Sequence, residues 1–470
     1  MTIRRAMTEW RFVLTLSALA LGAFGCTSDT DPTIDPTVDD AASAARVQVI
    51  LPDGLEVDDT LRSDLESLEG SLREMSEMLG IDASDAPIVV RYRGVGDVVD
   101  GDAESPEITF AAETEGTEDD ATEPADARSS WVTVNLSTGH EFEVTFPDEV
   151  IDRADARAHA EAMDLGSLDR HGLEVDENAV DPTEIPEVPE GPDGATFKGW
   201  SNAVDTRELM GTYNVAQTHS AYRRLVSLGV NGGCSGTLVG PKHIVTAAHC
   251  IRDFKNRAWR GSTAYAGRSG QNAWRASAAY NPDPDVAPTW YWVPSGFLSR
   301  ADGEEDMPFS ATPWDIGVMV THSSRMGDVV GWMGWYWWGS DSDFANRTRY
   351  NRGYPSCGRD NSPGAENDWD SKVCQNRGLY GDSRWCAAGE HSSPDGDGIN
   401  RRFRFHCDVS GGHSGSSLYH YLDGDTLVVT GVVSWEHCRT CSASDDRPNT
   451  GVRITKEYSG VISTLRQMFP

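Results

Sequence analysis

The stretch Gly232–Cys250, GGCSGTLVGPKHIVTAAHC, contains two apolar runs on either side of a Gly-Pro turn. Apolar runs around a turn predict a β-hairpin, which here ends at His249 beside two small alanines. Cys234 and Cys250 flank this hairpin, and a disulfide between them would stabilise the fold by roughly 3 kcal/mol through loop entropy. We therefore expect the hairpin to hold His249 in a fixed place.

A second stretch, Gly411–Ser417 with the sequence GGHSGSS, places Ser414 between glycines, as in turns that present a nucleophilic serine. Between the two stretches, Asp315 lies in the apolar run WDIGVMV. An acidic side chain in an apolar strand is unfavourable unless it has a partner, so Asp315 is the best candidate to pair with His249. The alternative carboxylates, which lie in polar surroundings, are Asp253, Asp302 and Asp306.

The TAAHC sequence with its preceding cysteine, followed by GGHSGSS, resembles the chymotrypsin clan of serine peptidases, and the order His, Asp, Ser agrees with that clan. Further segments resemble its bacterial glutamyl-endopeptidase-like branch: Gly327–Trp337, Gly353–Pro355, Cys407–Ser416 and Asn449–Ile454. The resemblance covers residues 199–470. It implies a mainly β fold of two six-stranded antiparallel β-barrels, here preceded by a small acidic α+β N-terminal domain.

The resemblance also implies a serine endopeptidase that uses a Ser-His-Asp triad and an acyl-enzyme. His249 would act as the general base for Ser414, and Asp315 would fix the histidine tautomer. The N–H groups of Gly412 and Ser414 would form the oxyanion hole. We expect protein or peptide substrates and no cofactor or metal. A peptidase fold without turnover that serves binding or adhesion, and an esterase with the same triad, are the alternatives.

Five residues are candidates for substrate binding: Asp408, Val433, Ser434, Trp435 and Glu436. Asp408 stands six residues before Ser414, the offset at which the trypsin-like branch selects Lys or Arg, although the glutamyl branch carries an aspartate there too. Val433 occupies the slot of the histidine that reads glutamate in that branch. Glu436 adds negative charge near the pocket, so we predict a basic residue at P1, the substrate residue before the cleaved bond.

Two positions in the serine turn depart from the families it resembles. His413 stands where trypsin has the aspartate that receives a new N-terminal amine, so that activation switch is excluded. Ser417 stands where the glutamyl branch usually has proline. We still expect cleavage near Lys198–Gly199, which would separate the acidic half from the peptidase half.

The N-terminal part of the chain has the features of an exported precursor. Residues 1–25 predict a signal peptide, and Cys26 follows a sequence similar to a bacterial lipobox, so we expect lipidation of Cys26. A lipid anchor would place the protein at the outer membrane or cell surface, and processing would release it to the outside. Composition then predicts a disordered tether at 26–57, an acidic α+β prosegment-like domain at 58–180, a linker at 181–198 and a peptidase domain at 199–470.

Within the acidic domain, apolar periodicity predicts specific elements: helices at 58–80 and 149–163, a strand at 87–93, and a hairpin formed by 131–136 and 141–146. We interpret this domain as a propeptide that acts as a folding chaperone or an inhibitor, or else as a spacer. Residues 27–198 carry a net charge of −35, whereas 199–470 carry −1. No basic face remains to bind phosphates, so nucleic-acid binding is not expected.

The cysteines fit an oxidising compartment. Apart from Cys26, all eight lie after residue 233, an even number that suits disulfides. Besides Cys234 and Cys250, six remain whose pairing the sequence leaves open: Cys357, Cys374, Cys386, Cys407, Cys438 and Cys441. The pairing of Cys407 with Cys438 or Cys441 is the first to test.

Overall fold

The computed structural model describes most of the chain between residue 47 and the C-terminus. The described residues are 47–82, 85–100, 129–164, 207–209, 221–229, 233–268, 288–355, 379–382, 386, 388–394, 398–407, 409, 411–422, 426–436 and 448–470. The predicted signal peptide, Cys26, the linker 181–198 and the cleavage site at Lys198 lie outside these residues.

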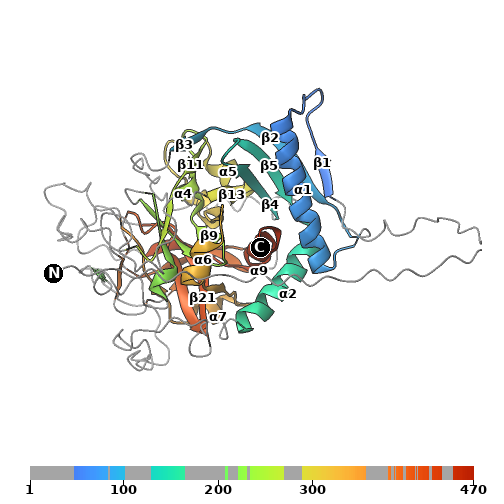
Figure 1. Ribbon diagram of the computed structural model, residues 1–470. Coiled ribbons are helices and arrows are strands. Elements are labelled where there is room, and N and C mark those ends of the chain that lie inside the picture. The colour runs from blue at the N-terminus through green and yellow to red at the C-terminus, as the bar shows by residue number, and fades with distance from the viewer. Residues whose placement is uncertain are drawn as a thin grey trace, which may run out of the picture. The chain divides into compact units, whose positions relative to one another are not determined.

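A ten-stranded sheet contains strands from both halves of the chain (Figure 1). Its strands, in spatial order, are β1 (Val47–Ile50), β2 (Ile88–Val95), β5 (His140–Thr145), β4 (Ser130–Asn135), β13 (Pro288–Pro294), β14 (Gly317–Thr321), β9 (His243–Thr246), β8 (Cys234–Leu238), β7 (Leu225–Leu228) and β12 (Ala264–Ala266). The last six lie in residues 199–470, the part expected to be a peptidase and called the peptidase half below. Neighbouring strands among these six pair in antiparallel fashion. They include the predicted hairpin of β8 and β9.

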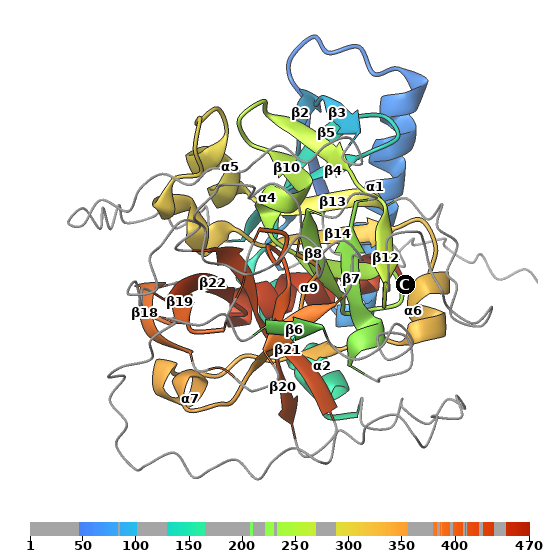
Figure 2. The same cartoon turned by 90° about the vertical axis from the view of Figure 1, so that its left-hand side faces the viewer.

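A seven-stranded sheet forms the second half of the peptidase region (Figure 2). It contains β16 (Tyr350–Asn351), β20 (Ser417–Leu422), β21 (Thr426–Trp435), β22 (Asn449–Arg453), β19 (Asn400–Phe405) and β18 (Ala388–Pro394), with β15 (Gly334–Trp335) pairing to β21. Two small sheets join β10 (Arg252–Asp253), β11 (Ala258–Gly261) and β3 (Val98–Asp100), and pair β17 (Tyr380–Asp382) with β6 (Arg207–Leu209). The predicted mainly β fold with an N-terminal α+β region is confirmed.

The first helix, α1 (Asp59–Leu79), follows the predicted apolar periodicity and buries Leu61, Leu68 and Leu72. It begins at Asp58, whose carboxylate accepts a hydrogen bond from the Leu61 N–H, and ends at Gly80 in a left-handed conformation. The remaining helices are α2 (Asp148–Asp164), η3 (Tyr222–Arg224), α4 (Ala248–Ile251), α5 (Ser295–Ala301), η4 (Phe309–Trp314), α6 (Arg325–Val330), α7 (Asp341–Ala345) and α9 (Lys456–Met468). The predicted helices, strand and hairpin of the acidic half are therefore all present, with ends that differ by a few residues.

The N-terminal region, residues 47–164, is joined to the peptidase half through β4 and β13. These strands pair in antiparallel register over five residues, from Trp290 with Asn135 to Pro294 with Trp131. Because β4 covers the edge strand of the peptidase sheet, the backbone groups of that edge are paired rather than exposed. All described residues belong to one compact unit, Ser43–Pro470.

A shared apolar core reinforces this joint. Trp131 is fully buried and its ring meets that of Tyr458 on α9 edge-on, at a centroid distance of 6.0 Å. Helix α2 packs against α9, where Gly460 has no side chain to collide with Ile151. Strand β1 lies in the stretch predicted as a tether and pairs with β2, so the end of that stretch is part of the fold. Within the described part of the chain, no helix is both long and apolar enough to span a membrane.

Candidate active site

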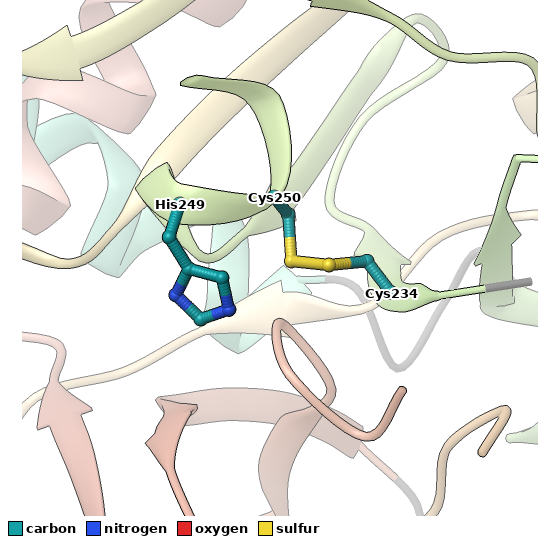
Figure 3. A group of neighbouring side chains, drawn as sticks. All are labelled: Cys234, His249 and Cys250. Carbon is teal, nitrogen blue, oxygen red and sulfur yellow. A yellow bond between two sulfur atoms is a disulfide. The ribbon is translucent and has the colours of Figure 1, made fainter. Parts of the chain in front are cut away.

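His249 lies on the short helix α4, directly after β9, and its side chain is completely buried. Cys250 follows it and forms the predicted disulfide with Cys234, with the two Cα atoms 5.9 Å apart (Figure 3). These three side chains form the only cluster of potential metal ligands found in the described residues. Because the sulfur atoms of the two cysteines are bonded to each other, neither is available to a metal as a thiolate. The disulfide acts as a clamp beside His249.

Asp315 is the carboxylate that pairs with His249. Its Oδ2 lies 2.7 Å from Nδ1 of His249, and its Oδ1 accepts a hydrogen bond from the backbone N–H of His249 at 2.9 Å. The hydroxyl of Ser434 donates a third hydrogen bond to Oδ2 at 2.6 Å. All three side chains are fully buried, so this network fixes both the imidazole ring and the carboxylate in a site without solvent.

The position of Asp315 differs slightly from the prediction. Asp315 caps the 3-10 helix η4, and strand β14 begins two residues later at Gly317. The residue therefore lies just before the apolar strand, where its carboxylate can reach α4. The other carboxylates considered bind elsewhere: Asp253 contacts Asn256 and Arg260, and Asp302 binds Arg252.

The serine turn is held by its backbone and by two glycines. Gly412 and Gly415 have φ angles of +95° and +82°, in the left-handed region that favours glycine. A side chain at Gly415 would also collide with Ser235 and Thr246 of the first peptidase sheet. The N–H of Gly415 donates to Val433 at 2.9 Å, which ties the turn to β21. The glycines therefore allow the turn to lie directly on the strand that precedes His249.

Ser414, half-buried, lies next to the His249 segment. Its carbonyl oxygen accepts a hydrogen bond from the Ser235 N–H at 2.7 Å, and the sulfur of Cys250 is 3.5 Å from the same oxygen. The backbone of Ser414 thus lies beside Cys250, the residue that follows His249.

His413 is buried beneath the turn. Its Nε2 lies 3.3 Å from the carbonyl oxygen of Tyr380, and a side chain at Gly353 would collide with its ring. Gly353 also exchanges two backbone hydrogen bonds with Tyr380. These contacts explain the glycine at 353, because it leaves space for the imidazole of His413. His413 stands at the position where trypsin has its aspartate.

Ser417, which replaces the usual proline, also has a structural explanation. Its hydroxyl accepts a hydrogen bond from Thr237 at 2.7 Å across the two peptidase sheets. The neighbouring Ser416 hydroxyl accepts one from the Asn351 amide at 2.8 Å. A proline at 417 would leave Thr237 without this partner.

The predicted substrate-binding residues are placed on and beside β21. Val433 and Trp435 are buried, Glu436 is half-buried at the end of the strand, and the Trp435 ring meets Phe309 edge-on at 5.1 Å. The hydroxyl of Ser434 binds Asp315, so its side chain belongs to the His249 network, and substrate binding at this part of β21 stays a prediction. Asp408 lies outside the described residues.

A second disulfide corrects the pairing chosen for the first test. Cys407 bonds to Cys386, with Cα atoms 5.1 Å apart, and not to Cys438 or Cys441. Strands β18 and β19 bring the two cysteines together, because Ala388 pairs with Phe405. The remaining four cysteines lie outside the described residues.

Sequence reasoning missed three polar residues around the turn: Ser235, Thr246 and Asn351. Ser235 and Thr237 are polar residues at alternate positions of a predicted strand. Alternate positions lie on the same face of a strand, so the sequence does place these two side chains together. Nothing in their spacing indicated that this face meets the serine turn.

Parts of the chain are similar to known proteins. Residues 211–287, which include His249, match the model of the Trypsin family. The matched range contains β7, β8, β9 and β12 of the first peptidase sheet. A glutamyl endopeptidase from Bacillus licheniformis is 26% identical over 238 residues, which cover 50% of this chain and 60% of that protein.

Two solved structures show weaker similarity. A Glu endopeptidase in complex with MPD has 19% identity and a TM-score of 0.39, with 56% of this chain and 97% of that one covered. The protease Anisep from Arthrobacter nicotinovorans has 15% identity and a TM-score of 0.32, with 49% and 89% covered. The match to the glutamyl endopeptidase thus spans about three fifths of that relative's length.

Proposed function

We propose that the protein is a serine endopeptidase that cleaves peptide bonds through an acyl-enzyme on Ser414. His249 takes the proton of the serine hydroxyl and returns it to the leaving amine. Asp315 holds the imidazole with Nδ1 protonated and stabilises the imidazolium that forms. The paired hydrogen bonds from His249 to both oxygens of Asp315 support this assignment.

The backbone N–H groups of Gly412 and Ser414 form the oxyanion hole of the proposed mechanism. A tetrahedral intermediate carries negative charge on the former carbonyl oxygen, and fixed donors stabilise that charge without reorganisation. The left-handed Gly412 supports this role, because an ordinary residue there would strain the turn. Losing one such donor costs about 3 kcal/mol of transition-state stabilisation.

One observation carries the proposal: a buried His–Asp–Ser434 network lies beside a glycine turn that presents Ser414. The test is hydrolysis of casein and of peptide amides by wild type, Ser414→Ala and His249→Ala, with Ser416→Ala as a matched control in the same turn. We expect both site variants to lose amide hydrolysis and Ser416→Ala to retain it. Cleavage of short esters alone would indicate an esterase, and no turnover by folded wild type would indicate a binding protein.

For the substrate residue before the cleaved bond, we propose Lys or Arg. Glu436, which directly follows the buried Trp435, supports this preference because its carboxylate brings negative charge to the end of β21. The relative named glutamyl endopeptidase favours a second candidate, an acidic residue. A panel of P1 peptides with Glu436→Gln separates them: neutralising Glu436 lowers kcat/KM for Lys peptides in the first case and raises it for Glu peptides in the second.

We also propose that the protein is exported, with a lipid on Cys26, and is processed near Lys198. The sequence of residues 1–26 and the disulfides of the described residues support export. Metabolic labelling with a radioactive fatty acid should label wild type and not Cys26→Ala. Purified Ser414→Ala protein should remain at full length; trimming of this variant to the mature mass would rule out self-processing.

A further inference from the structure

Glu141, on β5 of the N-terminal region, contacts the segment that directly follows His249. Its Oε1 accepts hydrogen bonds from Nε1 of Trp259 at 2.5 Å and from Nη1 of Arg252 at 3.3 Å. Arg252 is the C-cap of α4, the helix that carries His249. The acidic half therefore reaches the His249 helix through one carboxylate.

The contact is nearly closed to solvent. The side chains of Arg252 and Glu141 are 5% and 13% exposed, and the guanidinium lies 4.8 Å from the centre of the Trp259 ring. Asp302 binds the other side of the guanidinium at 2.6 Å. A buried cation needs charge partners around it, so Glu141 and Asp302 hold Arg252 from opposite parts of the chain.

A second contact joins the same regions. Strand β3 of the N-terminal region pairs in parallel with β11, and the Trp259 N–H donates to the Asp97 carbonyl at 2.7 Å. The described residues of 47–164 make no hydrogen bond or ion pair with Asp315 or Ser414. Their contacts near the site include Arg252, Trp259 and β11, in the segment that follows His249.

We propose that residues 47–164 are a permanent part of the peptidase, with Glu141 as a positioning residue that holds the Arg252 end of the His249 helix. This assignment rests on the proposed function and deepens it, because an inhibitor or transient chaperone would be released after cleavage near Lys198. The N-terminal region instead remains bound through β4, β3 and α2.

Whether residues 47–164 stay bound to the peptidase half after cleavage is tested without any assay of activity. A site for a specific protease is placed in the linker 181–198 of the full-length Ser414→Ala protein, which is cut and passed over a gel-filtration column without denaturant. We expect both fragments to elute together. Elution of residues 47–164 as a separate peak, with the peptidase half still folded, would overturn the proposal and would say nothing against the chemistry of Ser414.

The positioning role of Glu141 is tested by comparing kcat and KM of Glu141→Gln with those of Glu143→Gln. Glu143 lies two residues along the same strand but binds Ser130, Arg91 and Arg93 of its own region. We expect Glu141→Gln to lower kcat about three- to tenfold with KM within twofold, and Glu143→Gln to leave both unchanged. Equal kcat values in the two variants at equal melting temperature would contradict the positioning role.

A different observation concerns Ser235, on β8 of the first peptidase sheet. Its buried hydroxyl donates to the carbonyl oxygen of Gly412 and accepts from the Tyr354 N–H, both at 2.8 Å. Its backbone N–H donates to the Ser414 carbonyl at 2.7 Å, and its carbonyl accepts from the Thr246 hydroxyl at 2.7 Å. The hydroxyl and the backbone N–H of Ser235 thus connect β8 to the serine turn and to Tyr354, whereas its carbonyl bonds within the first peptidase sheet.

We infer that Ser235 is a positioning residue for the oxyanion hole. The Ser235 hydroxyl fixes the peptide plane between Gly412 and His413, and this plane separates the two N–H groups assigned to the hole. Without that bond the left-handed Gly412 is free to rotate, and the donors lose their common direction. The inference depends on the proposed function, because it concerns the transition state of that reaction.

The matched pair of variants is Ser235→Ala and Thr237→Val. Both remove one buried hydroxyl that crosses between the sheets, but only Ser235 contacts Gly412, since Thr237 binds Ser417. We expect Ser235→Ala to lower kcat ten- to a hundredfold and weaken a peptide boronic acid inhibitor by a similar factor, with little change in KM. Thr237→Val should lower the melting temperature by a similar amount and keep kcat within threefold.

Identical kcat values for the two variants would show that Ser235 acts only through stability, and would overturn the inference. Because fluorophosphonate labelling of Ser414 tests the nucleophile independently, loss of all labelling in wild type would instead count against the proposed function. Ser235→Thr, which keeps the hydroxyl, should regain part of the lost kcat.

Discussion

Two joints in this molecule are built from different chemistry. Where β4 meets β13, the joint between the N-terminal region and the peptidase half is apolar: Trp131, Phe146 and Trp292 are fully buried there, and β4 extends the sheet from β13. The joint between the two peptidase sheets is polar around Ser414, where buried hydroxyls and backbone groups meet. The first joint depends on buried apolar area, and the second depends on hydrogen bonds that fix the orientation of the groups they connect.

Magnitudes show why this division matters. Burying a large apolar side chain contributes about 1.5–3 kcal/mol, and the contribution depends little on orientation. A buried hydrogen bond contributes only about 0.5–1.5 kcal/mol net, but it fixes the position of both groups. The apolar contacts of the N-terminal joint should therefore act mainly on stability, and the polar contacts at Ser414 should act mainly on turnover.

The largest effect is expected for Asp315→Asn. An amide at this position favours the wrong imidazole tautomer, and we expect kcat to fall by about 10,000-fold, equivalent to about 5 kcal/mol. Steady-state hydrolysis of a peptide amide gives the rate, and thermal unfolding reports the fold. Asp253→Asn is the matched control, since Asp253 is also buried but binds Asn256 and Arg260. A comparable loss in Asp253→Asn would show that the site was assigned to the wrong carboxylate.

Trp131→Ala should show the opposite behaviour. Removing this fully buried ring between β4 and α9 should lower the free energy of unfolding by about 3–5 kcal/mol, because the cavity cannot fill. Urea denaturation gives that value, and kcat per labelled Ser414 should stay within about threefold. Met78→Ala, at an exposed position on α1, should stay within about 0.5 kcal/mol of wild type. A large fall in kcat per labelled site for Trp131→Ala would mean that the two joints are not separable.

Protonation of His243 should make the stability of the protein depend on pH. His243 lies on β9 and contacts the Leu465 carbonyl of α9. Burial, with Arg466 nearby, lowers the pKa of His243 to about 3 from 6.5. Because the unfolded chain binds the proton first, stability is full above pH 6.5 and falls as the pH drops towards 3, by up to about 1.4 kcal/mol per pH unit. The difference between wild type and His243→Gln, measured by urea denaturation from pH 4 to 7, should show this slope. Parallel curves for the two proteins would refute it.

The smallest effect is expected at the rim of the N-terminal joint. Lys456 on α9 lies 2.8 Å from Asp152 on α2, but both side chains are partly exposed to solvent. Such surface pairs contribute about 0–1 kcal/mol. Lys456→Ala should therefore change the free energy of unfolding by less than about 1 kcal/mol, with the difference vanishing in high salt. A larger loss would mean that the joint depends on charge as well as on apolar area.

The sequence predicted those parts of the molecule that depend on local pattern. The periodicity of α1, the β8–β9 hairpin and the clamp from Cys234 to Cys250 follow from residue spacing and are all present. Asp315 could be chosen because an acid beside an apolar strand needs a buried partner, and its bonds to His249 agree with that choice.

Contacts between distant segments could not be predicted in the same way. The pairing of β4 with β13 depends on which sheet edge is open, and Ser235 gains its partners only when the two peptidase sheets meet. The hydrogen bond from Ser434 to Asp315 could not be predicted either, because the position of Ser434 in the sequence does not give the direction of its hydroxyl. The pairing of Cys407 with Cys386 likewise follows from the register of β18 and β19, which cysteine spacing does not determine.

The most direct test of the account is covalent labelling of the wild-type protein with a fluorophosphonate, followed by peptide mapping by mass spectrometry. We predict one adduct, on Ser414, that forms at least a hundred times faster than in Asp315→Asn and is absent from Ser414→Ala. Labelling of another serine, or equal labelling rates in wild type and Asp315→Asn, would contradict the claim that the buried His249–Asp315 pair activates Ser414.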